Sequence, residues 1–318
     1  MAALLNRVET FLFLAVLITL SSPGFCQERT VAITVDDLPY AGSTQGQRVP
    51  PPTLDEARET NGKLLAALKR HRVPATGFVI QKTVEKLGGN EILERWIAAG
   101  NDLGNHTYSH KSANALDVAS VKTEIEKGEI AFVPLMERAH KRQRFVRFPF
   151  NHTGDTKEKH DAIAEYLKER GYQLAVCTID NQDYVFNDAY LKAQALGDVQ
   201  MAKRIKAAYL NYTDQQIDYY ASLNKQVLGR EPPQIMLLHD NKLNADAADE
   251  VLSIFESKGF KFVSLAQAQA DPAYQTPDTF YTQFGWMWGY RWARQLNVRV
   301  DGSQEKEPPE WIPEYLSR

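Results

Sequence analysis

The chain has 318 residues and a formal net charge of −3, with 43% hydrophobic and 24% charged residues. This balance is ordinary for a globular protein, and the length allows one large domain or two small ones. It gives no reason to expect nucleic acid or an anionic membrane as a partner, because those surfaces attract strongly basic proteins.

The N-terminus has the pattern of an export signal. Arg7 precedes an unbroken apolar run at 11–20, which is about half of the ~20 residues that a membrane-spanning helix needs. We therefore expect residues 1–26 to be a cleaved signal, with no membrane span after its removal and a secreted or periplasmic location. A buried N-terminal helix and a lipid-modified Cys26 are the alternatives.

Downstream of this segment, short apolar runs alternate with helical patterns. The predicted strands are 31–35, 75–80, 102–105, 145–150, 174–179, 235–239 and 260–264. The predicted amphipathic helices are 54–70, 91–99, 121–136, 159–170 and 244–258. Strands that alternate with helices predict an α/β fold with a parallel sheet and helical crossovers. About seven such units favour a barrel, although an open doubly wound sheet gives the same pattern.

Two segments fall outside this alternation. Residues 187–229 are polar, helical and rich in Tyr and Lys, so they are interpreted as an insertion between two strands. The insertion either forms a lid over the catalytic face or packs sideways against the outer helices. Residues 271–318 form a C-terminal extension with three Trp and one Tyr between positions 286 and 292. Such rings stack on sugars or close barrel ends, and we favour the structural role.

Polar and ionisable residues stand at the carboxyl ends of five predicted strands, namely Asp36, Asp37, His106, His110, Arg147, Asp183 and His239. Adjacent aspartates serve one site only where the strand ends and the backbone turns, since successive side chains of a strand point to opposite faces. Histidines four apart share one face of a helical turn and can bind one metal ion. Two histidines and a carboxylate together predict a three-ligand metal site with the open position that hydrolysis needs.

In their order and spacing, these motifs resemble those of the polysaccharide deacetylases of carbohydrate esterase family 4. The family's Thr-Phe-Asp-Asp-Gly motif corresponds to 34–38, and its His-Ser/Thr-x-x-His motif is intact at 106–110. Its Arg-x-Pro-Tyr motif corresponds to 147–150, its Asp-Trp pair to 183–184, and its Leu-x-His motif to 237–239. The resemblance covers residues 30–268 and implies a distorted (β/α)7-type barrel that carries the insertion and the aromatic tail.

The resemblance also implies a role for each site residue. The ligands of Zn²⁺, or of another divalent metal, would be Asp37, His106 and His110. Asp36 would be the general base and His239 the general acid.

The remaining motif residues would support these groups. Arg147 would orient the base, and Asp183 would pair with the acid. The backbone N–H of Phe150 would stabilise the oxyanion, and Tyr184 would form a wall beside the acid.

The predicted function is a metal-dependent hydrolase that removes N-acetyl, or O-acetyl, groups from sugars through a metal-activated water. Leu38 replaces the family's glycine, Phe150 its tyrosine and Tyr184 its tryptophan. These changes remove no catalytic group but can alter the substrate. The alternatives are therefore a metal-dependent amidase or esterase with a non-polysaccharide substrate and, with less support, a non-catalytic sugar-binding protein.

Overall fold

The computed structural model describes residues 28–44 and 52–318, so the predicted signal lies outside the described residues. Within them, parallel strands form one curled sheet in the order β5-β4-β3-β2-β1-β7-β6, and β8 pairs with β1 beside this path. The strands are β1 (Thr30–Leu38), β2 (Thr76–Val79), β3 (Asp102–Asn105), β4 (Phe145–Val146), β5 (Gln173–Leu174), β6 (Ile179–Asp180), β7 (Gln234–His239) and β8 (Lys261–Phe262). The distorted (β/α)7-type barrel predicted from the sequence is confirmed.

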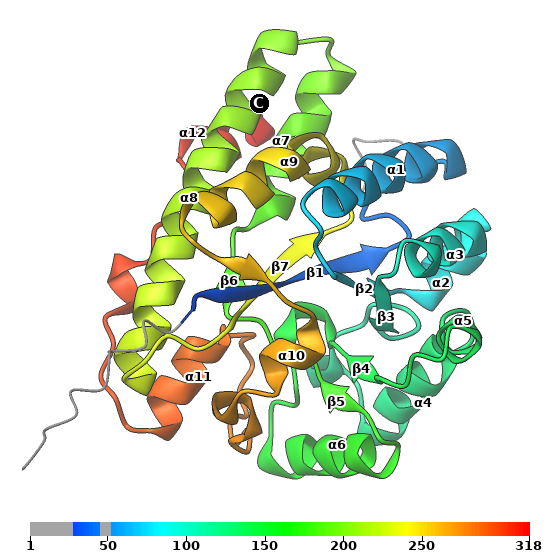
Figure 1. Ribbon diagram of the computed structural model, residues 1–318, viewed down its shortest axis with the longest axis vertical. Coiled ribbons are helices and arrows are strands. Elements are labelled where there is room, and N and C mark those ends of the chain that lie inside the picture. Colours follow the sequence, from blue (N-terminus) through cyan, green and yellow to red (C-terminus); the bar gives the residue numbers. More distant parts are fainter. Residues whose placement is uncertain (1–27, 45–51) are drawn as a thin grey trace, which may run out of the picture.

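Helices pack around most of the curled sheet (Figure 1). They are α1 (Leu54–Arg70), α2 (Gln81–Leu87), α3 (Asn90–Ala98), α4 (Val118–Gly128), α5 (Val133–Arg138), α6 (Lys157–Glu169), α7 (Asp183–Ala195), α8 (Val199–Leu228), α9 (Lys242–Ser257), α10 (Leu265–Gln269), α11 (Trp288–Gln295) and α12 (Trp311–Ser317). The first helix begins where predicted because Thr53 and Glu56 form a capping box. Its Leu64 and Leu68 are buried against the barrel.

Several predicted boundaries are wrong. The helix expected at 121–136 is two helices, α4 and α5, and Pro134 lies in the first turn of the second. The helix expected at 244–258 begins earlier, at Lys242, because the side chain of Asn241 caps it and accepts a hydrogen bond from the Asn244 N–H. The strand expected at 145–150 ends at Val146.

The run expected to form one strand at 174–179 instead crosses between the two edges of the sheet. Its first residues pair with β4 and its last residues pair with β7. Side chains satisfy the carbonyls between them: Arg147 donates to Ala175 O and Val176 O, and Gln269 donates to Leu174 O. No helix fits in so short a link, so the barrel flank here lacks a crossover helix.

The C-terminal extension covers part of that flank. The backbone N–H of Trp288, at the start of α11, donates to Cys177 O at 3.1 Å. Trp288 and Trp292 are buried, as the structural role predicts. Trp286, in contrast, is 42% exposed.

The insertion packs sideways and does not form a lid. Its tyrosines Tyr209, Tyr212 and Tyr220 are buried, and α8 lies along α7 and α9 on the outside of the barrel (Figure 1). The helical segment also begins earlier than expected, at Asp183. Among the described residues, no helix is both long and apolar enough to cross a membrane.

Candidate metal centre and active site

Asp36 and Asp37 reach the same site because the backbone turns between them. Asp37 has a φ of 70°, in the left-handed region, and the pairing of β1 with β2 is irregular between Val35 and Leu38. The side chains of the strand thus stop alternating between the two faces of the sheet at the point where the sequence predicted a turn. Such strain in a non-glycine residue is typical of functional sites.

His106 and His110 also converge, but not for the predicted reason. Residues 106–110 form a loop and no helical turn, and both Thr107 and His110 have positive φ values of 68° and 58°. The two imidazole rings lie 5.0 Å apart between centroids. The loop is fixed from below, where the N–H and hydroxyl groups of Ser109 donate to Glu124 of α4 at 2.7 Å each.

The three predicted ligands fit a divalent cation. One oxygen of Asp37 lies 3.3 Å from Nε2 of His106 and 3.3 Å from Nε2 of His110. This oxygen is buried and accepts no hydrogen bond in the described structure. Nδ1 of His106 lies 2.8 Å from the Arg147 carbonyl oxygen, which can only accept, so Nε2 presents its lone pair. Ligand atoms that converge in this way could hold a divalent cation between them.

Electrostatics favour the ligand forms of Asp37 and His110, whereas for His106 burial is outweighed by Asp36 and Asp37, which raise the pKa of its imidazole. Burial opposes the ionisation of Asp37, but the charges of His110, His106 and His239 hold its pKa well below the usual value. Burial lowers the pKa of His110, which favours the neutral imidazole. A carboxylate and neutral imidazoles are the forms that bind a metal.

Asp36 is held by a buried ion pair. An oxygen of its carboxylate lies 2.8 Å from Nη1 of Arg147, and both side chains are almost fully buried. The same Nη1 donates to the hydroxyl of Thr34 at 2.7 Å. The predicted contact between Arg147 and Asp36 is therefore present, and the same guanidinium also bonds the crossing segment of the barrel.

His239 and Asp183 form a second pair. Nδ1 of His239 lies 2.6 Å from one carboxylate oxygen of Asp183, and the His239 backbone N–H donates to the other at 2.7 Å. Burial opposes protonation of His239, but Asp183 outweighs it and raises the pKa of the imidazole to about 10. His239 is also the register partner of Asp36 across β7 and β1, so the predicted acid and base are neighbours.

Two exposed rings flank these groups. Phe150 is 59% exposed and its ring centroid lies 5.1 Å from that of His110. Tyr184 is 40% exposed and lies edge-on to His239 at 6.0 Å. Both rings stand at positions where the chain departs from the family motif. Phe150 also has a positive φ of 60°, so the turn that carries its N–H is strained.

Sequence reasoning missed two residues that support the site. Asn244 donates to Asp183 and to the His239 carbonyl, and it accepts from Tyr209 of the insertion. Arg291 of the tail is buried and donates to the Asn151 carbonyl, next to Phe150. Neither residue lies in a motif, and no local pattern marks them.

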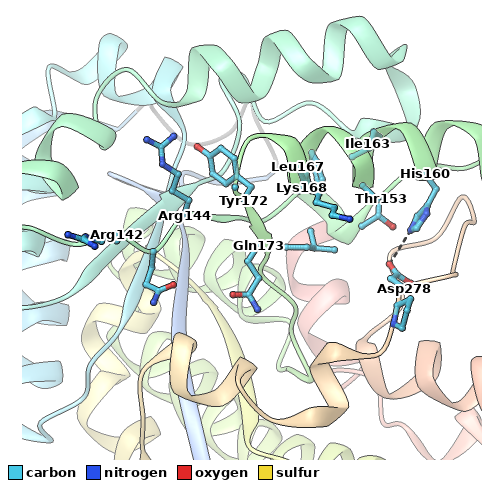
Figure 2. A pocket seen from close by; sticks show the side chains of 16 residues that line it. Arg142, Arg144, Thr153, His160, Ile163, Leu167, Lys168, Tyr172, Gln173 and Asp278 are labelled. Carbon is cyan, nitrogen blue, oxygen red and sulfur yellow. Dashed lines mark hydrogen bonds and ion pairs between the residues drawn. The ribbon is translucent and has the colours of Figure 1, made fainter.

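A separate hollow of about 590 Å³ lies between α6, β5 and the start of the C-terminal tail (Figure 2). Arg142, Arg144 and Lys168 are among the residues that line it. None of the predicted site residues does so. The hollow is thus distinct from the candidate metal centre.

The sequence profile of a family described as "Polysaccharide deacetylase" matches residues 26–175. A peptidoglycan-N-acetylglucosamine deacetylase from Bacillus cereus is 24% identical over 213 residues, which are 65% of this chain and 62% of that enzyme. The chain therefore spans less than two thirds of the length of this relative.

Solved structures share the fold. A polysaccharide deacetylase from Bacillus cereus superposes with a TM-score of 0.52 at 19% identity, covering 74% of this chain and 92% of the other. A protein from Bacillus anthracis, described as a pseudoenzyme of carbohydrate esterase family 4, has a TM-score of 0.50 at 16% identity. That match covers 76% of this chain and 66% of the other.

Proposed function

We infer that this chain, which belongs to the polysaccharide deacetylase family (carbohydrate esterase family 4), is a metal-dependent hydrolase that removes N-acetyl groups from sugars. The observation that carries this proposal is the convergence of Asp37, His106 and His110 beside two hydrogen-bonded pairs, Asp36 with Arg147 and His239 with Asp183. The first group of residues would bind the metal, and the two pairs would transfer protons.

Asp37, His106 and His110 would hold the ion, for which the ligand set favours zinc. When bound, a divalent metal polarises a carbonyl oxygen and makes water a stronger nucleophile at neutral pH. Asp36 accepts the proton of the attacking water. The Arg147 guanidinium, 2.8 Å from the Asp36 carboxylate, fixes the direction of that carboxylate, which a general base requires.

His239 supplies the second proton transfer. An amine is a poor leaving group unless it is protonated, and Asp183 keeps His239 in the protonated form that can donate. The N–H of Phe150 donates to the developing oxyanion, and one such donor is typically worth about 3 kcal/mol. The exposed rings of Phe150 and Tyr184 offer faces on which a sugar ring can stack.

A metal-dependent amidase or esterase with a different substrate is the second candidate. It is favoured by the same two aromatic positions, because Phe150 and Tyr184 border the site and differ from the family motif. A non-catalytic role, as described for the Bacillus anthracis relative, has less support here because the base and the acid are both retained.

The proposal is tested by assaying acetate release from metal-reconstituted protein that lacks residues 1–26. The substrates are chitooligosaccharides, peptidoglycan fragments and matched O-acetylated sugars. We expect release from N-acetylated sugars that a chelator abolishes and added metal restores, and Asp36→Asn serves as the inactive control. Metal-dependent release only from O-acetyl or non-sugar substrates would favour the second candidate. No hydrolysis of any substrate by protein loaded with metal would contradict catalysis.

A further inference from the structure

The C-terminal extension presents an exposed aromatic segment. Between Phe280 and Met287 the chain carries Tyr281, Phe284 and Trp286, which are 47%, 63% and 42% exposed. Large apolar side chains exposed together on one short segment are typical of a binding surface. None of the eight residues in this segment is charged.

This segment touches the candidate active site. A side chain on Gly285 would place its Cβ 1.7 Å from the Phe150 carbonyl oxygen, so only glycine allows this close approach. Phe284 and Trp286 are the chain neighbours of Gly285, and consecutive Cα atoms are about 3.8 Å apart. Their exposed rings therefore start beside the residue whose own ring packs on His110.

The segment is also held rigidly. Arg291 donates to the carbonyls of both Trp286 and Asn151, and thereby joins the tail to the turn that follows Phe150. Asn114, beyond the histidine loop, donates to the Thr282 carbonyl at 3.0 Å. A rigid surface loses little conformational entropy when a ligand binds.

Further contacts anchor the segment at its start. His160 of α6 lies 3.3 Å from a carboxylate oxygen of Asp278, and the same oxygen accepts from Arg291. Figure 2 marks the contact between His160 and Asp278 with a dashed line. The Trp286 ring packs against Phe280 at 5.1 Å between centroids. The position of Trp286 is thus determined on the side that packs, and the rest of the ring remains open to solvent.

We propose that Phe284 and Trp286 form a platform on which the substrate glycan stacks beyond the sugar that is deacetylated. This inference rests on the proposed function and deepens it, because it names the substrate as an oligosaccharide or longer chain. The uncharged segment suits a neutral, N-acetylated glycan, and aromatic faces pack on the C–H faces of sugar rings. Because the segment adjoins Phe150 at the candidate active site, we expect the substrate glycan to occupy it and not a protein partner.

The test compares Phe284→Ala and Trp286→Ala with the unaltered protein on N-acetylglucosamine oligomers of two to six units. We expect KM for the pentamer and hexamer to rise about fivefold, which corresponds to about 1 kcal/mol, while kcat and the disaccharide kinetics stay unchanged. Trp286→Phe retains a ring and should restore most of the affinity. Leu296→Ala, which removes another exposed apolar side chain after α11, is the matched control.

A binding measurement separates the platform from catalysis. Calorimetric titration of hexamer into Asp36→Asn protein, with and without Trp286→Ala, should give a Kd that is about fivefold weaker in the double variant. If the parent enzyme hydrolyses oligomers but neither KM nor Kd responds to loss of the rings, the platform is wrong and the proposed function stands. If no sugar is hydrolysed, the proposed function is wrong, and the binding measurement still tests the platform by itself. A weaker Kd in the double variant would support the platform, and an unchanged Kd would contradict it.

Discussion

Replacing Asp183 by asparagine removes the charge that keeps His239 protonated and keeps the size of the side chain. Asp183 raises the pKa of His239 to about 10 against an opposing effect of burial, so without it we expect a pKa at or below the ordinary 6.5. At pH about 8 the protonated fraction of the imidazole would then fall from nearly all to roughly 3%. Since only the protonated form can act as the acid, kcat should fall about 30-fold at this pH.

The assay is the pH profile of kcat for the metal-loaded enzyme on an N-acetylated oligosaccharide. In Asp183→Asn the alkaline limb should move to lower pH, and the difference from the parent should narrow below pH about 6.5. Asp180→Asn is the matched control, because this neighbouring carboxylate accepts from the Gln182 N–H and acts on His239 only through its charge, so its loss should move the alkaline limb less. A uniform loss at every pH would refute the electrostatic role of Asp183 and leave only a structural one.

The same pair affects stability with a defined sign. Because the pKa of His239 is raised on folding, its contribution to the free energy of unfolding is fully present below pH about 6.5. That contribution is lost as pH rises through about 10. The melting temperature of the parent should therefore fall more steeply over this range than that of Asp183→Asn, with metal held constant.

Three other predictions concern the metal, the tail and export. His110→Ala should abolish retention of the divalent ion, as measured by elemental analysis. Asp36→Asn should retain the ion and lose a factor of at least ~10² in kcat. An undiminished metal content in His110→Ala would contradict the ligand assignment. Arg291→Ala should lower the free energy of unfolding by about 3 kcal/mol in chemical denaturation, because it leaves the partners of a buried charge unsatisfied. Exposed Arg294→Ala should change it by less than about 0.5 kcal/mol, and equal losses would contradict the anchoring role. The mature protein should begin near Gln27 by mass spectrometry, and a native protein that retains residues 1–20 would rule out the signal.

The sequence could predict the architecture because its signals are local and periodic. The helix at 54–70 was predicted with correct bounds, since Thr53, Glu56 and the apolar spacing are all local features. Parallel strands bring their carboxyl ends to one edge of a sheet. Residues as distant as Asp36 and His239 could therefore be assigned to one site, and the structure pairs them in register.

Other features could not be predicted, because they depend on contacts between distant segments. The convergence of His106 and His110 comes from positive φ values in a loop held by α4, and not from helical periodicity. The run at 174–179 reads as one strand in sequence. In the structure this segment connects the two edges of the sheet, and its carbonyl oxygens accept hydrogen bonds from Arg147 and Gln269. Only the position of the two edges in the folded barrel decides this.

The tail shows the difference most clearly. In the sequence, Trp286 and Trp288 are equivalent members of one aromatic cluster. In the structure, Trp288 is buried against the barrel flank that lacks a crossover helix, whereas Trp286 remains 42% exposed beside Phe150. The sequence by itself determined the family motifs and the strand–helix alternation, because both depend on the spacing of residues that are close together in the chain. Which aromatic side chains are buried, and that Arg291 and Asn244 support the site, were decided only by tertiary packing, because burial depends on neighbours more than 50 residues away in the chain.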